Sequence, residues 1–223
     1  MFWIIPSSCS VYHPFICWVP KREKLNNGGE KQLNISECLL FLQGFLTNPQ
    51  RVGSVIPSSR FLAAKIVESI PWNEVKAVAE LGSGTGAITR FMKPHLTGST
   101  RVLLFERDKK MRATLKTKYS DFACHSNACQ LIKKLNQDDI GQLDCIISGL
   151  PFFNFTSEMR ESLLNQIIKA LKPEGIFVAY QYSLQMKKKF AEDLIIEKIE
   201  FVPFNFPPAF VYTCRKRGGN NRY

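Results

Sequence analysis

The segment that most constrains the fold of this chain is a glycine-rich turn at residues 79–87, with the sequence Ala-Glu-Leu-Gly-Ser-Gly-Thr-Gly-Ala. An apolar run over 75–81 precedes it, and the pattern after it is helical, with Ile88, Phe91 and Met92 on one face. Glycines place no Cβ between the backbone and a ligand. The following helix directs its first amides and its dipole at the same place. The segment therefore predicts a strand–turn–helix unit that binds a ligand.

Two ligand classes use such a turn. Dinucleotide-binding proteins carry G-x-G-x-x-G/A, which this turn satisfies at Gly82, Gly84 and Ala87. The turn is also similar, at every position, to the E/D-x-G-x-G-x-G motif of S-adenosylmethionine (SAM) methyltransferases. A carboxylate suits the cationic methionine end of SAM better than a pyrophosphate, so SAM is the favoured cofactor over a dinucleotide or a turn without ligand. The residues expected to bind it here are Glu80, Gly82, Ser83, Gly84, Thr85 and Gly86.

Composition narrows the class of protein further. The 223 residues, 45% of them apolar, suit one domain with a sizeable core. A formal net charge of +11 favours an anionic partner, either nucleic acid or an acidic membrane surface, although simple solubility would also explain it. The seven cysteines are scattered without a C-x-x-C pair, and we expect them to be reduced core residues of a cytosolic protein. The three histidines lack ligand spacing, so we expect no metal site.

The pattern along the chain predicts an α/β fold. Strands are expected at 75–81, 101–106, 121–125, 143–148, 176–181, 199–204 and 209–214. Helices are expected at 60–70, 87–93, 109–119, 131–135, 158–171 and 185–191. Too few residues separate the last two strands for a helix, so they should be antiparallel. This predicts the Rossmann-like seven-stranded sheet typical of class I methyltransferases, with strand order 3-2-1-4-5-7-6, the last strand antiparallel, and the ligand at the carboxyl ends of the strands.

Four segments are expected around this sheet. Residues 1–35 read as a leader and linker, either a membrane-contacting segment or sequence upstream of the natural start. Residues 36–72 form an N-terminal helical extension, and residues 73–215 form the SAM-binding domain. Residues 216–223 are a basic tail. No stretch reaches the length and apolarity of a transmembrane helix.

Polar residues after the second and third strands complete the expected cofactor site. Glu106 ends the second strand about twenty residues past the glycines, where an acid accepts the ribose hydroxyls. The adjoining Arg107 is also expected at the cofactor, although Glu106 could instead simply pair with it. Asp108 then caps the next helix. Asn127 and Ala128 occupy the place where SAM enzymes often carry Asp-Ala, and the Asn127 oxygen can accept one bond from adenine. An ordinary turn is the alternative there.

The fourth strand ends in Ser-Gly-Leu-Pro-Phe-Phe over 148–153. This resembles the x-L-P-F/Y element of N-methyltransferases, in which carbonyls before the proline accept hydrogen bonds from the target amine and align it with the methyl group. The proline has no N–H to compete for those carbonyls. Phe152 and Phe155 could belong to the site or to the core. We expect Gly149, Leu150, Pro151 and Phe152 to form the catalytic element, with Ser148 at the cofactor and Phe153 at the substrate.

Four motifs together resemble the bacterial phospholipid N-methyltransferases of the PmtA type. They are 41–49 with 52–59, Ser148–Pro151, Gln181–Ser183 and Asn205–Tyr212. The resemblance covers roughly Leu39 to Arg215. It implies SAM-dependent methylation of the amine of phosphatidylethanolamine or a related aminophospholipid, by a monomer that is cytoplasmic and peripheral on the inner face of the membrane.

The same resemblance assigns further residues. Tyr182 would orient the amine, while Pro57, Ser58 and Asn205 would contact the substrate. The apolar face of residues 39–46 would lie on an anionic membrane, or alternatively pack on the sheet or cover the cofactor pocket.

Two other functions remain open from the sequence. An rRNA adenine N6-methyltransferase would share the sheet and the cofactor motif, but its N-L-P-Y/F element has an asparagine where this chain has Gly149. The basic tail over 215–223 could contact phosphates of RNA or of lipid, or simply be a solvated end. A SAM-binding protein without catalysis is the third possibility.

Overall fold

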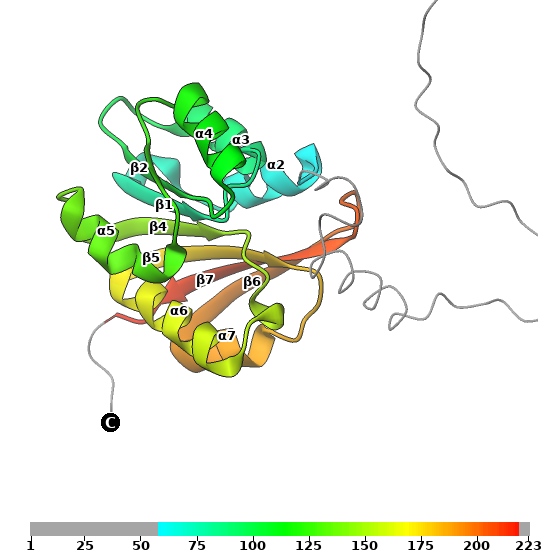
Figure 1. Ribbon diagram of the computed structural model, residues 1–223. Coiled ribbons are helices and arrows are strands. Elements are labelled where there is room, and N and C mark those ends of the chain that lie inside the picture. The colour runs from blue at the N-terminus through cyan, green and yellow to red at the C-terminus, as the bar shows by residue number, and fades with distance from the viewer. Residues whose placement is uncertain (1–57, 219–223) are drawn as a thin grey trace, which may run out of the picture.

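The computed structural model describes residues 58–218, in which helices cover both faces of one sheet (Figure 1). Its strands are β1 (Ala77–Leu81), β2 (Arg101–Phe105), β3 (Ala123–His125), β4 (Leu143–Ser148), β5 (Leu171–Gln181), β6 (Leu194–Val202) and β7 (Ala209–Lys216). Its α-helices are α2 (Arg60–Glu68), α3 (Ala87–Met92), α4 (Lys109–Lys118), α5 (Leu131–Gln137), α6 (Ser157–Ala170) and α7 (Lys187–Asp193). Short 3₁₀ helices are η1 (Trp72–Glu74), η2 (Lys93–His95), η3 (Ala128–Gln130) and η4 (Phe152–Asn154).

The sheet has the order β3-β2-β1-β4-β5-β7-β6, which confirms the predicted order. Strands β1 to β5 pair in parallel, whereas β7 is antiparallel to both of its neighbours, as expected for the final hairpin. The strand β5 begins at Leu171 rather than at the predicted residue 176. The polar stretch after Leu171, which resembled a loop, is an irregularity in the pairing with β4, and Glu174 takes a positive φ of 61° there.

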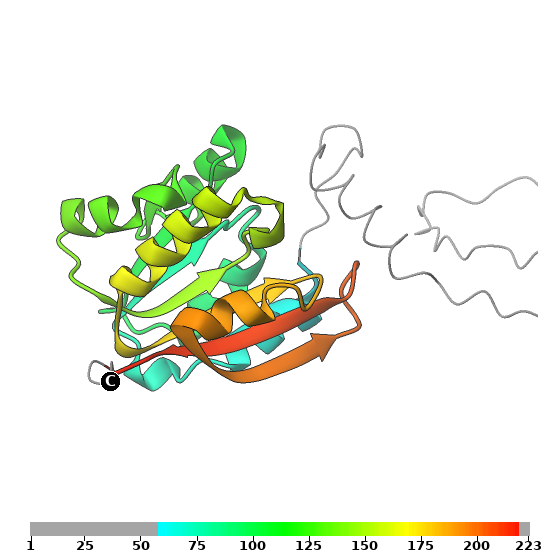
Figure 2. The same ribbon diagram turned by 90° about the horizontal axis from the view of Figure 1, so that it is seen from below.

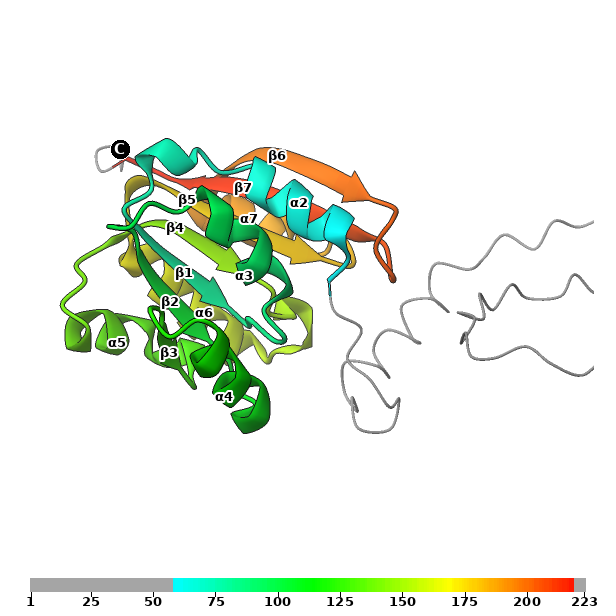
Figure 3. The same ribbon diagram turned by 90° about the horizontal axis from the view of Figure 1, so that it is seen from above.

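Alternate residues of the central strands divide the interior into two apolar layers. In β1, Ala77, Ala79 and Leu81 pack in the layer that includes side chains of α5, α6 and α7. Val78 faces the opposite layer, with α2, α3 and α4. Figure 3 shows α2, α3 and α4 over one face of the sheet, and Figure 2 shows α6 and α7 on the other. This arrangement leaves the ends of the strands as the place where a ligand can reach the backbone.

Side-chain caps fix where the helices begin. The Ser59 hydroxyl accepts from Leu62 N at 3.1 Å, and the Asp108 carboxylate accepts from Met111 N at 2.8 Å. Both bonds satisfy amides that have no partner inside the helix. The predicted cap at Asp108 is confirmed, and of the two serines considered for α2, Ser59 is the cap.

Several predictions concern residues outside 58–218. They are the leader, the membrane-facing segment at 39–46, the substrate contact at Pro57 and most of the basic tail. Within the described range, no helix is long and apolar enough to cross a bilayer. The same residues contain no group of three or more His, Cys, Asp or Glu placed to hold a metal ion. Cys145 and Cys214 are buried free thiols in β4 and β7.

Candidate active site at the carboxyl edge of the sheet

The glycine turn leaves β1 and enters α3 through three left-handed positions. Gly82, Gly84 and Gly86 have φ angles of 81°, 54° and 78°, which residues with a Cβ rarely adopt. The amides of Gly82 and Ser83 both donate to the carbonyl of Phe105 at the end of β2, at 2.8 and 3.0 Å. A Cβ on Gly84 would meet nothing within 4 Å. The turn is therefore tied to the sheet at its start, while its middle presents open backbone.

The carboxylate of Glu80 lies fully buried beneath this turn. One oxygen accepts from the Thr89 hydroxyl of α3 at 2.5 Å, and the other oxygen has no hydrogen-bond partner. Burial raises the pKa of Glu80 to about 8; the bond from Thr89 opposes this rise, and the nearby Glu106 adds to it. A buried carboxyl with an unpaired oxygen needs a donor or a cation to be ionised at low cost. The methionine end of SAM carries such a cation, so the residues present fit this cofactor.

The carboxylate of Glu106 lies on the other side of the turn. Its oxygens accept from Gly84 N at 2.7 Å and from Asp108 N at 2.8 Å. Two backbone donors hold the group at the carboxyl end of β2, and each oxygen keeps a further lone pair for a hydroxyl. Arg107 is exposed, and neither it nor Glu106 takes part in an ion pair among the described residues.

The remaining cofactor predictions fall around the same edge. Thr85 is exposed at the turn, and Ser83 is buried with its hydroxyl donating to the Glu80 carbonyl at 3.3 Å. The Asn127 oxygen accepts from Cys129 N at 2.9 Å and so caps η3, while Ala128 packs against the core. The adenine role of Asn127 remains a prediction.

The end of β4 brings the expected catalytic element against the glycine turn. Gly149 N donates to the carbonyl of Leu81 at 2.9 Å, and a Cβ on Gly149 would lie 3.2 Å from the carbonyl oxygen of Gly82. The Ser148 hydroxyl is buried and accepts from Leu150 N at 3.3 Å. The two glycine-bearing segments therefore touch through their backbones, and a side chain at Gly149 would separate them.

The carbonyl of Leu150 is already engaged. It accepts from Phe152 N at 2.9 Å, across Pro151, and from the side-chain amide of Gln181 at 2.9 Å. Among the described residues, no hydrogen bond to the carbonyl of Gly149 is present. Of the two carbonyls expected to receive the amine, Gly149 is therefore the available acceptor.

Two residues of β5 complete this region. The sequence motifs do not single out Tyr180, and they include Gln181 without giving it a role. The ring of Tyr180 packs on Gly149, with Cε1 at 3.1 Å from the position of a Cβ there. Gln181 is buried and donates to the carbonyls of Leu150 and Tyr180. Because carbonyls only accept, the Gln181 amide nitrogen faces them and its oxygen remains available. The register of β4 with β5, which pairs Ser148 with Ala179, produces these contacts.

The predicted orienting residue Tyr182 lies next to Tyr180. Their rings meet edge to face at 5.9 Å between centroids. Burial raises the pKa of both hydroxyls above the usual value for tyrosine. Both therefore stay protonated at neutral pH, where they can orient a substrate but cannot act as bases.

The predicted substrate contacts Ser58 and Asn205 lie together, although they are far apart in sequence. The Ser58 hydroxyl donates to Tyr180 Oη at 3.3 Å, and Ser59 N donates to the Asn205 side chain at 2.9 Å. Asn205 is buried and also donates to the carbonyl of Pro207 at 2.7 Å. A chain of contacts thus runs from the turn before β7, through the start of α2, to the end of β5.

The aromatic residues after β4 are distributed between the core and the surface differently from the prediction. Phe152, which the sequence favoured as a site residue, is fully buried in the core, edge to face with Phe155, Phe177 and Phe190. Its ring points into the layer under α6 and α7, so only its backbone can belong to the acceptor region. Phe153 is exposed. The loop is held by Arg160, whose guanidinium donates to the carbonyls of Phe152, Phe153 and Phe155.

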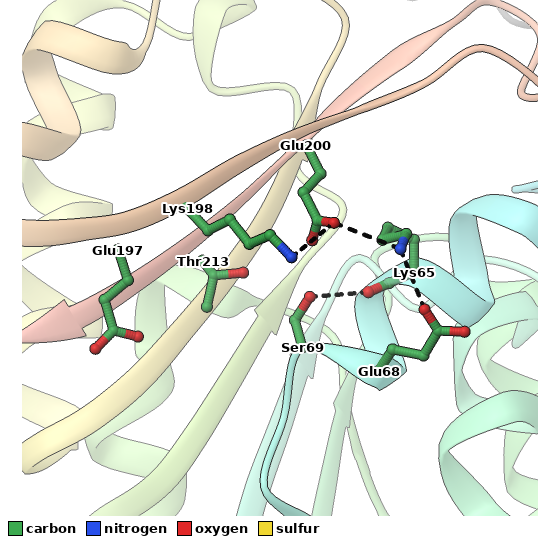
Figure 4. Close-up of a pocket in the computed structure, with 7 residues that line it drawn as sticks. All are labelled: Lys65, Glu68, Ser69, Glu197, Lys198, Glu200 and Thr213. Carbon is green, nitrogen blue, oxygen red and sulfur yellow. Dashed lines mark hydrogen bonds and ion pairs between the residues drawn. The ribbon is translucent and has the colours of Figure 1, made fainter.

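A separate depression of about 400 Å³ lies between α2 and the hairpin of β6 and β7 (Figure 4). Lys65 pairs there with Glu68 at 3.2 Å and with Glu200 at 3.4 Å, and Lys198 pairs with Glu200 at 2.9 Å. These charges compensate one another. The depression shares no residue with the glycine turn, and we assign it no ligand.

Comparison with known proteins agrees with this geometry. A family model described as a methyltransferase domain matches residues 78–175. The chain is 30% identical over 190 residues to an ornithine lipid N-methyltransferase of Singulisphaera acidiphila, a match that covers 81% of this chain and 97% of that protein.

Solved structures share the fold at low sequence identity. The N-methyltransferase NodS from Bradyrhizobium japonicum WM9 aligns with a TM-score of 0.56 and 11% identity over 70% of this chain and 94% of that one. An O-methyltransferase from Bacillus cereus, solved with SAH, aligns with a TM-score of 0.57 and 11% identity over 81% of this chain and 91% of that one. Since these neighbours act on different acceptors by their names, the fold alone does not select the acceptor.

Proposed function

The chain belongs to the class I SAM-dependent methyltransferases, and we propose that it transfers a methyl group to the amine of a membrane aminolipid, such as phosphatidylethanolamine. The choice of an amine as the acceptor rests on the carbonyl of Gly149. This carbonyl lies against the glycine turn and receives no hydrogen bond from the described residues. An amine N–H is the natural donor to such a carbonyl.

The residues of this chain would act mainly by positioning. Bound SAM supplies an electrophilic methyl group on sulfur. Glu80 would hold its cationic end and Glu106 its ribose. The Gly149 carbonyl would orient the amine so that its lone pair faces the methyl group, with Tyr182 beside it. Holding two reactants in line in this way lowers the barrier substantially without covalent chemistry.

An acceptor amine must reach this site in its neutral form, because a protonated amine has no lone pair. Tyr180 and Tyr182 have raised pKa values and therefore cannot take its proton at neutral pH. We infer that the proton leaves to solvent before the amine enters, and that exclusion of water by the tyrosine rings keeps it neutral. Turnover should then rise with pH as the fraction of neutral amine increases.

The lipid class is supported by two similarities. The relative from Singulisphaera acidiphila is, by its name, an N-methyltransferase that acts on ornithine lipid. The motifs at 148–151 and 205–212 resemble those of phospholipid N-methyltransferases. Gly149 lacks the side-chain amide that an adenine N6-methyltransferase would use at this position, so RNA is the weaker acceptor.

The test is methyl transfer from labelled SAM to three acceptors in parallel. They are vesicles of phosphatidylethanolamine with phosphatidylglycerol, vesicles of ornithine lipid with phosphatidylglycerol, and unmodified ribosomal RNA, each with Gly82→Val as the inactive control. Label in either lipid extract supports the proposal and distinguishes the two head groups. Label in the RNA alone, or in no lipid, overturns it.

A further inference from the structure

The large apolar side chains that the described residues expose are concentrated at one edge of the molecule. Seven of the eight lie where β4, β5 and β6 end or where α2 and α6 begin. The most exposed are Phe204 and Phe206, at 72% and 67%, in the turn between β6 and β7. The eighth, Ile195, lies near the start of β6, at the opposite end of the strand. Exposed apolar groups that gather in this way mark an interaction surface.

This edge is also the mouth of the acceptor region. Gln181, the last residue of β5, pairs with Phe210, so the β6–β7 turn lies beyond the carboxyl end of β5. Figure 1 shows this hairpin turn, in orange and red, beside the start of α2. The turn is tied to α2 by the bond from Ser59 to Asn205 and by the rings of Phe61 and Phe204, whose centroids lie 5.3 Å apart.

Basic residues surround the aromatic group. The Arg60 guanidinium lies over the ring of Phe61, 4.8 Å from its centroid. Lys187 and Lys188 are exposed at the start of α7, on the other side of β5. Among the described residues, none of these three cations has an acidic partner. Aromatic side chains flanked by unpaired cations complement an anionic phospholipid surface, with rings at the acyl boundary and cations at the phosphates.

We propose that this edge docks on anionic phospholipid membranes, with Phe204 and Phe206 of the β6–β7 turn inserted among the lipids and Arg60, Lys187 and Lys188 at their phosphates. The inference rests on the proposed function, because a lipid amine must enter from a bilayer. The contacts from Asn205 through Ser59 and Ser58 to Tyr180 connect the inserted turn to Gly149. The docked orientation would bring the head groups directly to the Gly149 carbonyl.

The first experiment compares vesicle binding by the full chain and by the double variant Phe204→Ser/Phe206→Ser, using flotation with phosphatidylethanolamine–phosphatidylglycerol vesicles. Ile195→Ser is the matched control, because Ile195 is also large and exposed, at 48%. We expect the double variant to bind about tenfold more weakly or worse, because it lacks the two aromatic rings that the membrane would bury. The control should bind normally. Equal binding by the double variant and the wild type would overturn the docking surface.

A second measurement guards against misfolding of the double variant. Phe206→Trp should gain an emission component that brominated acyl chains quench, whereas Ile195→Trp should not. Absence of quenching at residue 206 would overturn the proposal, because the turn would then not be inserted among the acyl chains.

Methyl transfer to phosphatidylethanolamine dispersed in detergent separates the two proposals. If the double variant methylates dispersed lipid normally but loses activity on vesicles, both stand. If the wild type methylates no aminolipid in either form while the double variant still loses vesicle binding, the docking surface stands and the proposed function fails.

Discussion

The cofactor half and the acceptor half of this site are built in different ways. The cofactor half comes from one contiguous turn and the end of the neighbouring strand, and its carboxylates are held by backbone amides or buried beneath them. The acceptor half collects Ser58, Gly149, Tyr180, Gln181 and Asn205 from four separate segments. The cofactor half is lined mainly by charged carboxylates and turn backbone, whereas the acceptor half is lined mainly by neutral hydroxyls and carbonyls. The difference indicates that one half is set by local sequence and the other by sheet register.

The strongest way to break both halves at once is Gly82→Val. This glycine has a φ of 81°, and a Cβ there would lie 3.1 Å from Leu150 Cδ2 of the acceptor loop. A β-branched residue in this conformation is strained and would push the two halves apart. We expect SAM affinity to fall by about a hundredfold, measured by calorimetry, with turnover lost.

Gly98→Val is the control for this change, because a Cβ at Gly98 meets nothing within 4 Å. It should leave both SAM affinity and thermal unfolding close to wild type. Normal SAM binding by Gly82→Val would overturn the cofactor role assigned to this left-handed position of the turn.

Removing either carboxylate should affect the cofactor half alone. We expect Glu80→Ala or Glu106→Ala to weaken SAM binding tenfold or more, about 1.4 kcal/mol, as for a lost charge-assisted hydrogen bond. Calorimetry checks the affinity, and Glu68→Ala on the exposed face of α2 is the control. Unchanged affinity in either variant would overturn the assigned role of that carboxylate.

The contrast between the halves also explains what the sequence could predict. The hairpin, the glycine turn and the Asp108 cap follow from local patterns, the strand order follows from the resemblance to class I methyltransferases, and the structure has each of them. The roles of Tyr180 and Gln181 were not predicted because their contacts with Gly149 and Leu150 depend on the pairing of β4 with β5. An alternating strand pattern cannot show which residue will face a given loop.

Phe152 illustrates the same limit from the opposite direction. Its place beside the proline suggested a site residue, but the bend at Pro151 turns the ring into the layer under α6 and α7. Phe177 and Phe190 provide the pocket for that ring. Aromatic packing partners far apart in sequence cannot be assigned from one chain alone.

The pH dependence that follows from the ionisation of Glu80 offers a further test of the cofactor half. The pKa of Glu80 rises from 4.5 to about 8 in the folded protein. Between these two pH values, Glu80 is therefore protonated in the folded, ligand-free protein and ionised in the unfolded chain. The stability of the ligand-free protein should therefore fall as pH rises from 4.5 to 8. A cation at Glu80 favours the ionised form, so SAM affinity should increase by up to about 25-fold between pH 6.5 and 8.5, which is the change in the ionised fraction for a pKa of about 8.

Calorimetry in buffers of different ionisation enthalpy measures the proton released on binding. Glu80→Gln keeps the acceptor for Thr89 but cannot ionise, so its SAM affinity should vary much less over the same range. A wild-type affinity that is flat with pH would mean that Glu80 is already ionised in the free protein.

The smallest expected effect is in the acceptor half. Tyr182→Phe removes a hydroxyl that burial keeps protonated, while its ring can still pack against Tyr180. If the hydroxyl orients the amine, turnover should fall about fivefold with SAM affinity unchanged, because one neutral hydrogen bond contributes roughly 1 kcal/mol. Equal losses in turnover and SAM affinity would instead mark Tyr182 as a residue that supports the fold of both halves. Steady-state rates on dispersed lipid, paired with calorimetry on the same preparation, distinguish these outcomes. Tyr119→Phe, in the same apolar layer as Tyr182, controls for the loss of a buried hydroxyl, since Tyr119 Oη has no hydrogen-bond partner among the described residues.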